Sequence, residues 1–69
     1  MLSYEPLWET MKVKEINTYA LIYKYEIPSK TIYNLKHNKS ITMYTLEKLC
    51  YILNCTPNDI VKFVYNEEQ

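Results

Sequence analysis

The sequence predicts an all-α fold of five short helices, and three features indicate it. Apolar residues recur mostly at spacings of three and four, the period of a helix with one buried face. Pro6, Pro28 and Pro57 each stand where a helix would begin, since the first turn has no use for the N–H that proline lacks. Glycine is absent from all 69 residues, so few positions interrupt this pattern. Only residues 2–4 are expected to be extended.

Length and composition favour one folded domain over residues 1–69. Hydrophobic residues make up 48% of the chain and charged residues 23%, a balance that favours folding over disorder. We expect a flexible tail only at residues 66–69. The sequence has no apolar run near the ~20 residues of a membrane span and no basic, then apolar, signal at its amino end. These features predict a cytoplasmic protein that does not enter a membrane.

The first helix is expected over residues 6–14. Leu7, Trp8 and Met11 form its apolar stripe, with acidic residues near the positive end of its dipole. Because Trp8 is the largest side chain, we expect it to anchor the core.

A second helix is expected over residues 18–24, capped by Asn17 or Thr18. Leu21 and Tyr25 lie four apart on its inner face. A three-residue turn, residues 25–27, follows it.

The third helix begins at Pro28 or Ser29 and continues to His37. Ile32 and Leu35 point inward, which leaves the other face polar and basic.

Thr42 or Thr45 caps a fourth helix, and Asn54 is a plausible left-handed stop because Asn tolerates positive φ better than most residues. Its buried stripe consists of Leu46, Leu49, Cys50 and Leu53. A last short helix starts at Thr56 or Pro57 and carries Ile60, Phe63 and Val64.

The charges are distributed unevenly although the net charge is zero. Between residues 27 and 46 the chain has Lys30, Lys36, Lys39 and His37 and no acid. A neutral protein with this pattern can present one basic face. The alternative is that these lysines form an ordinary solvated surface.

The two short helices expected over residues 18–38 have the arrangement of a helix-turn-helix, a motif whose second helix commonly reads DNA. The residue types predict how the motif packs. Leu21 and Ile22 are the apolar residues of the first helix, and Ile27 is the apolar residue of the turn. Ile32 and Leu35 hold the second helix against the core.

Three ordered runs resemble a known family: Ile16-Asn17-Thr18-x-x-Leu21, Ile27-Pro28-Ser29-x-Thr31-Ile32-x-x-Leu35 and Leu46-x-x-Leu49-Cys50-x-x-Leu53-Asn54-Cys55-x-x-x-Asp59-Ile60. The chain resembles the Cro/phage-repressor family (Cro/C1-type, XRE-like) of bacterial and phage transcription regulators over about residues 4–64. The opening Tyr4-Glu5-Pro6-Leu7-Trp8 is similar to very short members of it. The resemblance implies a compact five-helix, lambda-repressor-like fold. It also implies sequence-specific binding of double-stranded DNA, commonly as a homodimer.

The resemblance further implies roles for individual residues. The positions that face base edges in the major groove are matched by Ser29, Lys30, Tyr33 and Asn34. Asn34 can pair with adenine, and Lys30 can donate to guanine O6 or N7. Phosphate contacts, which position the protein without specifying sequence, are expected from Thr18, Lys36, His37, Lys39 and Thr42. An exposed or loop-capping imidazole is the alternative for His37.

Two residues depart from the family pattern. Glu26 occupies a turn position that often holds glycine, so a non-glycine residue has to accept an unfavourable backbone angle or the turn differs. Ile22 stands where a small alanine usually lies between the motif helices, and its larger side chain would push them apart.

A protein-interaction module on the same fold, such as an antitoxin-like or anti-repressor partner, is the alternative function. The zero net charge, Glu26 and the eight tyrosines favour it. An enzyme is not expected, because no paired carboxylates and no nucleophile beside a base appear. With one histidine, His37, and with Cys50 and Cys55 expected as buried thiols, we expect no metal site and no cofactor.

Two dimer surfaces are compatible with the sequence. One is the last helix with Phe63 and Tyr65, and the other is the extended segment over residues 2–4. The sequence does not choose between them.

Overall fold

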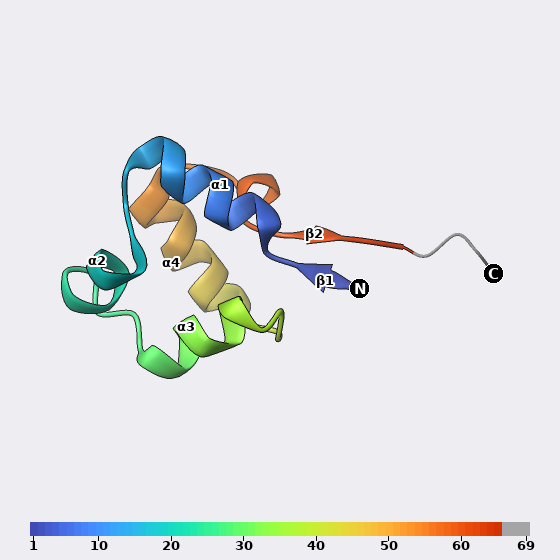
Figure 1. The fold of residues 1–69 in the computed structure, drawn as a ribbon, viewed down its shortest axis with the longest axis horizontal. Helices are drawn as coiled ribbons and strands as arrows, with labels where there is room; N and C mark the ends of the chain where they lie inside the picture. Colours follow the sequence, from blue (N-terminus) through green and yellow to red (C-terminus); the bar gives the residue numbers. More distant parts are fainter. Residues whose placement is uncertain (66–69) are drawn as a thin grey trace.

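The computed structural model of the chain describes residues 1–65, so the tail predicted at 66–69 lies outside the described residues. Four α-helices surround a small core, and a short antiparallel strand pair projects from one end (Figure 1). The elements in chain order are β1 (Leu2–Ser3), α1 (Glu5–Lys14), α2 (Thr18–Tyr23), α3 (Ser29–Lys36), α4 (Met43–Leu53), the 3-10 turn η1 (Pro57–Asp59) and β2 (Lys62–Phe63). None of the helices within residues 1–65 is long and apolar enough to cross a membrane.

Local side-chain caps set the starts of α2 and α4. The Asn17 side chain accepts a hydrogen bond from the Ala20 N–H at 2.8 Å, and the Thr42 hydroxyl accepts one from the Thr45 N–H at 3.1 Å. Each cap satisfies a backbone donor that has no partner in the first turn of a helix. Of the predicted alternatives, Asn17 and Thr42 are therefore the caps.

Within residues 1–65, four non-glycine residues adopt left-handed backbone angles, and two of them end helices. Asn54 ends α4 with φ 52°, as predicted, and Glu15 ends α1 with φ 59°. Glu26 and Asn38 are the other two. A chain without glycine has to make these turns with residues that tolerate them less well.

The predicted fifth helix is wrong. Only one 3-10 turn forms, closed by a capping box in which the Thr56 N–H donates to the Asp59 carboxylate at 3.2 Å. The chain then becomes extended, and β2 pairs with β1 in antiparallel register, Leu2 opposite Phe63. The backbone pairing of the two ends continues one residue beyond the strands, where the Val64 N–H donates to the Met1 carbonyl at 2.7 Å.

Two physical causes explain this difference. Residues 61–65 are mostly β-branched or aromatic, which favours a strand once a partner is present. The partner is the amino-terminal segment, and an ion pair of 2.7 Å between Lys62 and Glu5 joins the two ends of the chain. Ile60 is fully buried as expected, but Phe63 and Val64 are exposed and do not belong to a helix.

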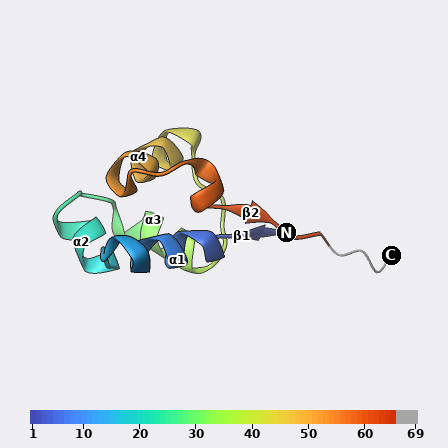
Figure 2. The same ribbon diagram turned by 90° about the horizontal axis from the view of Figure 1, so that it is seen from above.

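The core is a single cluster of buried apolar side chains to which every helix contributes. In the view of Figure 2, α4 lies on one side of the core and α1 and α3 lie on the other. Trp8 packs against the edge of this cluster and stays partly exposed, so the predicted anchor is wrong, and its neighbour Leu7 is fully buried instead. The cluster consists of Tyr4, Leu7, Met11, Leu21, Ile27, Ile32, Leu35, Leu49, Leu53 and Ile60.

The two cysteines are free thiols, only partly buried rather than fully buried as predicted. Burial is nevertheless the largest cause that raises the pKa of both Cys50 and Cys55.

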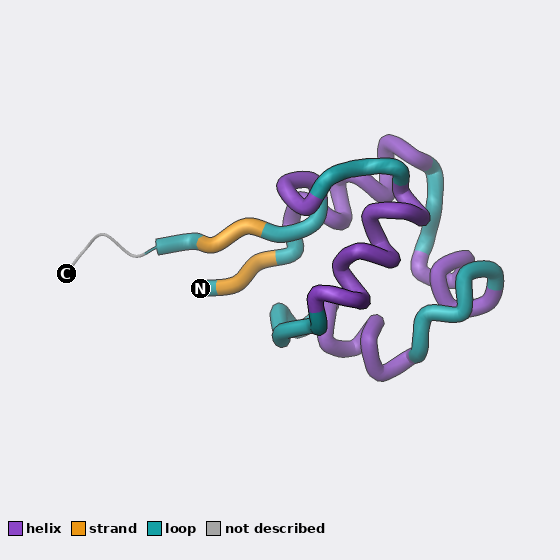
Figure 3. Tube along the Cα trace, turned by 180° about the vertical axis from the view of Figure 1, so that it is seen from behind, coloured by secondary structure: helices purple, strands orange, loops and turns teal. Residues whose placement is uncertain are grey.

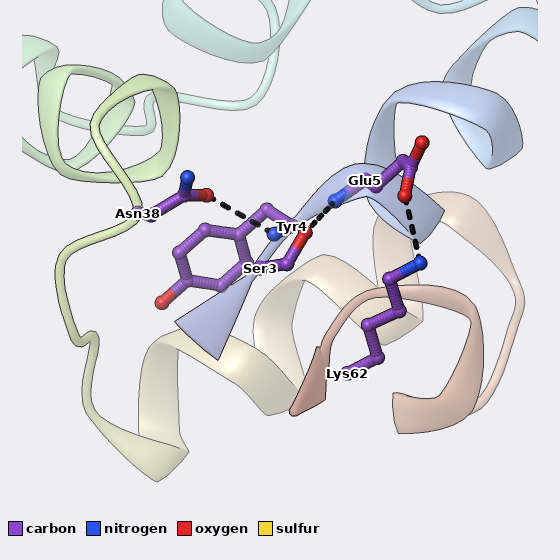
Figure 4. A network of polar contacts seen from close by, with 5 residues as sticks. All are labelled: Ser3, Tyr4, Glu5, Asn38 and Lys62. Atoms are coloured by element: carbon purple, nitrogen blue, oxygen red, sulfur yellow. Dashed lines mark hydrogen bonds and ion pairs between the residues drawn. The ribbon is translucent and has the colours of Figure 1, made fainter. Parts of the chain in front are cut away.

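Tyr4 is a core residue that the sequence pattern does not reveal. Its side chain is 1% exposed, and its hydroxyl donates to the Lys39 carbonyl at 2.7 Å. The Tyr4 N–H also donates to the Asn38 side-chain oxygen at 3.2 Å (Figure 4). These two bonds attach the start of α1 to the loop that follows α3.

Replacing Tyr4 with phenylalanine is expected to lower the free energy of unfolding by about 1 kcal/mol at neutral pH, because the Lys39 carbonyl loses its donor. Burial raises the pKa of Tyr4 above 10.0, so folding favours the protonated phenol. The stability from this group is fully present below pH 10 and is lost as the pH rises through the folded pKa. Urea unfolding followed by circular dichroism should show a smaller alkaline loss in Tyr4→Phe than in the unmodified chain. Tyr65→Phe, at an exposed tyrosine, is the matched control, and an equal alkaline loss in all three proteins would contradict the assignment.

Candidate nucleic-acid interface

The helices α2 and α3 are held together by buried apolar contacts and by the turn between them. Leu21 of α2, Ile27 of the turn and Ile32 of α3 are all buried, as predicted. The Ile27 N–H donates to the Leu21 carbonyl at 2.9 Å, which closes the turn over the apolar contact. This packing fixes the orientation of α3 relative to the rest of the molecule.

The turn is longer than the predicted three residues. The helix α2 ends at Tyr23 and α3 begins at Ser29, so residues 24–28 form the connection. Pro28 is the residue just before α3, and its backbone is extended, with φ −60°, the angle that its ring fixes, and ψ 145°. The Lys24 ammonium lies 5.4 Å from the centre of the Tyr25 ring, a cation–π contact that places one more positive charge at the turn.

Glu26 does accept the unfavourable backbone angle. Its φ is 59°, in the left-handed region that costs a non-glycine residue roughly 1 kcal/mol. Its side chain is exposed beside the start of α3. The turn therefore keeps the glycine-like conformation at an energetic cost, and it adds a negative charge next to the basic segment.

Ile22 is accommodated at the edge of the core. It is partly buried and packs against the cluster, while Leu21 beside it is fully buried. The larger side chain therefore does not prevent α2 and α3 from packing.

The four predicted base-reading residues lie on α3 away from the buried side chains of Ile32 and Leu35. Positions three and four apart on a helix share a face, and the four residues lie within about 140° of the helix circumference, so they belong to one side of α3. Their exposure differs, since Asn34 is partly buried and the others are exposed. The four are Ser29, Lys30, Tyr33 and Asn34.

His37 and Tyr33 form a contact that sequence reasoning missed. Their ring centres are 4.1 Å apart with a tilt of 34°. The spacing of four residues on a helix is the signal that predicts such a pair. The contact places the His37 imidazole directly beside a predicted base-reading side chain.

The predicted phosphate contacts occupy different environments. Lys36 and Lys39 are exposed near the carboxyl end of α3, and Thr18 is partly buried at the start of α2. Thr42 is exposed, but its hydroxyl accepts the Thr45 N–H and donates to the Thr45 hydroxyl at 3.0 Å. The hydroxyl of Thr42 is thus already engaged in capping α4.

The exposed charged side chains of α3 and of the loop after it are all basic. Lys30, Lys36 and Lys39 are exposed there, and residues 27–46 contain no acid. The ion pair of Glu5 and Lys62 lies beside the strand pair, away from α3 (Figures 1 and 4). Within residues 1–65, no three histidine, cysteine, aspartate or glutamate side chains gather where they could hold a metal ion.

Two short helices packed around the buried Ile27 of the turn between them, with one exposed and acid-free side on the second helix, define a helix-turn-helix domain. A family model described as the Cro/C1-type HTH DNA-binding domain matches residues 6–66. The chain belongs to this family of Cro/C1-type helix-turn-helix DNA-binding domains.

One solved structure is similar over most of its length. It is the crystal structure of the transcriptional regulator VanUg, with a TM-score of 0.85 and 23% sequence identity. The similar region covers 94% of this chain and 87% of that chain. At this identity the similarity establishes the shared fold. No curated protein matches the sequence significantly.

Replacing Glu26 with glycine is expected to raise the free energy of unfolding by about 1 kcal/mol, because glycine adopts positive φ without strain. It should also strengthen binding to duplex DNA, because a negative charge beside α3 is removed. Unfolding in urea and fluorescence anisotropy with a DNA duplex measure the two effects.

Two further variants separate strain from charge. Glu26→Gln keeps the left-handed strain and removes the charge, so it should strengthen DNA binding without the gain in stability. Glu15→Gly relieves the same strain at the end of α1 and should change stability alone. Unchanged DNA binding in both Glu26 variants would show that the turn does not approach DNA.

Proposed function

We propose that this protein is a sequence-specific DNA-binding transcriptional regulator, of bacterial or phage origin, that inserts α3 into the major groove. The observation that carries the proposal is the exposed side of α3, which is free of acids and bears hydrogen-bonding side chains. Base edges in the major groove present distinct donor and acceptor patterns, so such a helix can discriminate sequences. Such a regulator acts in the cytoplasm, where bacterial and phage DNA is found.

In this proposal, four residues of α3 contact base edges. The Asn34 amide pairs with an adenine, and the Lys30 ammonium donates to guanine O6 or N7. Ser29 and Tyr33 supply hydroxyl groups, and Tyr33 is braced by its ring contact with His37. The side chains assigned to phosphate contacts are Thr18, Lys36, His37, Lys39 and Thr42.

The protein binds DNA as a homodimer in this proposal. A reading helix of eight residues touches only a few base pairs. Two copies spaced by about one turn of DNA, roughly 34 Å, add their contacts on a palindromic site. The dimer surface cannot be a fifth helix carrying Phe63 and Tyr65, because that helix does not form.

Selection of bound duplexes from a random DNA library, followed by anisotropy at two salt concentrations, tests this function. A shared, palindromic site with affinity that falls steeply with salt is expected, because neutralised phosphates release counterions. No enrichment with a folded protein would contradict the proposal and favour a protein-interaction module. The exposed aromatic pair Tyr19 and Tyr23, with ring centres 4.6 Å apart on α2, is the observation that favours that alternative.

Single substitutions test the base-reading assignment. Lys30→Ala and Asn34→Ala are each expected to weaken binding to the selected site by ~1 to 3 kcal/mol while the fold stays intact. Lys36→Ala should instead weaken binding to all sequences similarly and lower the salt slope by about 1. Lys12→Ala, at an exposed lysine on α1, is the control. Equal specific binding by Lys30→Ala and the control would remove Lys30 from the reading surface.

A further inference from the structure

The outer side of α4 carries two exposed tyrosines that nothing in the described chain covers. Tyr44 is 75% exposed and Tyr51 is 79% exposed. They are seven residues apart, close to two helical turns, so they lie on one line along the helix. Large aromatic side chains exposed together on one helix face mark a surface for association.

One acid and one base flank this line on opposite sides. At 100° per residue, Glu47 lies about 50° to one side of the Tyr44–Tyr51 line and Lys48 about 50° to the other. Glu47 is exposed, and Lys48 is partly exposed. A groove of about 490 Å³ runs beside Tyr44 on the Glu47 side, lined by Met43, Tyr44, Leu46, Glu47, Cys50 and Pro57.

The charges of this surface are complementary to those of a second copy in only one relative orientation of the two α4 helices. If two copies pack these surfaces with a two-fold axis parallel to α4, each Glu47 faces the Lys48 of the other copy. If the two helices instead run antiparallel, the same geometry brings Glu47 against Glu47 and Lys48 against Lys48. Like charges placed opposite each other are unfavourable, so charge selects the parallel arrangement.

The parallel arrangement also agrees with the position of α3. The amino end of α4 lies next to α3, and the carboxyl end lies on the far side of the molecule (Figures 1 and 3). A two-fold axis parallel to α4 therefore puts both copies of α3 at the same end of the dimer, where one DNA duplex can contact both. An antiparallel pair would put them at opposite ends.

We propose that α4 is the surface through which two copies of this chain form a parallel, two-fold dimer. Tyr44 and Tyr51 form its centre, and reciprocal Glu47–Lys48 ion pairs form its two margins. The inference rests on the proposed function for the role of this dimer on DNA. The dimer itself is a property of the free protein.

Charge reversal tests the pairing. Sedimentation velocity of the free protein, from about 10 µM to 1 mM, gives the dimer dissociation constant. Glu47→Lys and Lys48→Glu, each alone, are expected to weaken the dimer about tenfold or more, because each puts like charges opposite each other. The double variant carrying both reversals should restore the dimer, because the pairs re-form with exchanged signs. Tyr44→Asp and Tyr51→Asp should abolish the dimer, and Tyr23→Asp on α2 is the matched control.

Each result decides between the dimer and its absence. A monomer at all concentrations, or a dimer indifferent to the single reversals, overturns the proposal. Failure of the double reversal to restore the dimer, with circular dichroism showing a folded chain, overturns the ion pairing and with it the parallel arrangement. A charge-dependent dimer that selects no DNA site supports this inference while the proposed function fails. A protein that selects a palindromic site without this dimer leaves the function standing and overturns the inference.

Discussion

The position of α3 depends on the buried apolar cluster at the turn, which includes Leu21 of α2, Ile27 of the turn and Ile32 of α3. All three side chains are buried, and the hydrogen bond from the Ile27 N–H to the Leu21 carbonyl closes the turn above them. Burial of a side chain of this size contributes roughly 1.5 to 3 kcal/mol, so a small protein with one core depends heavily on each such contact. Because α3 packs on the same cluster, its exposed side is fixed relative to α2.

Features that depend on neighbouring residues could be predicted from the sequence. The left-handed stop at Asn54 is local and agrees with the structure, and each observed cap, Asn17 and Thr42, is one of the two alternatives that the sequence offered. The fifth helix could not be rejected in this way, because its residues become extended only by pairing with the amino-terminal segment, about 60 residues away in sequence. Tyr4 was missed for the same reason, since its hydroxyl partner is the Lys39 carbonyl.

In the candidate site, too, local patterns could be predicted from the sequence and specific contacts could not. Helical periodicity correctly separated the buried Ile32 and Leu35 from the polar side of α3. Periodicity does not report what a hydroxyl or a ring already contacts, so the engagement of Thr42 in a cap and the ring contact of His37 came only from the structure. A contact between a side chain and a base depends on the geometry of a complex with DNA, so helical periodicity does not predict it.

The absence of glycine has a consequence for how this sequence can vary. In the part of the chain that the structure describes, the backbone is left-handed at four places, and these are filled by two glutamates and two asparagines, namely Glu15, Glu26, Asn38 and Asn54. β-Branched residues and proline fit this conformation poorly, whereas glycine, asparagine and aspartate fit it well. In a deep mutational scan these exposed positions would show a narrow tolerance resembling that of core positions, although their side chains bury little. Surface exposure alone is therefore a poor guide to mutational freedom in this protein.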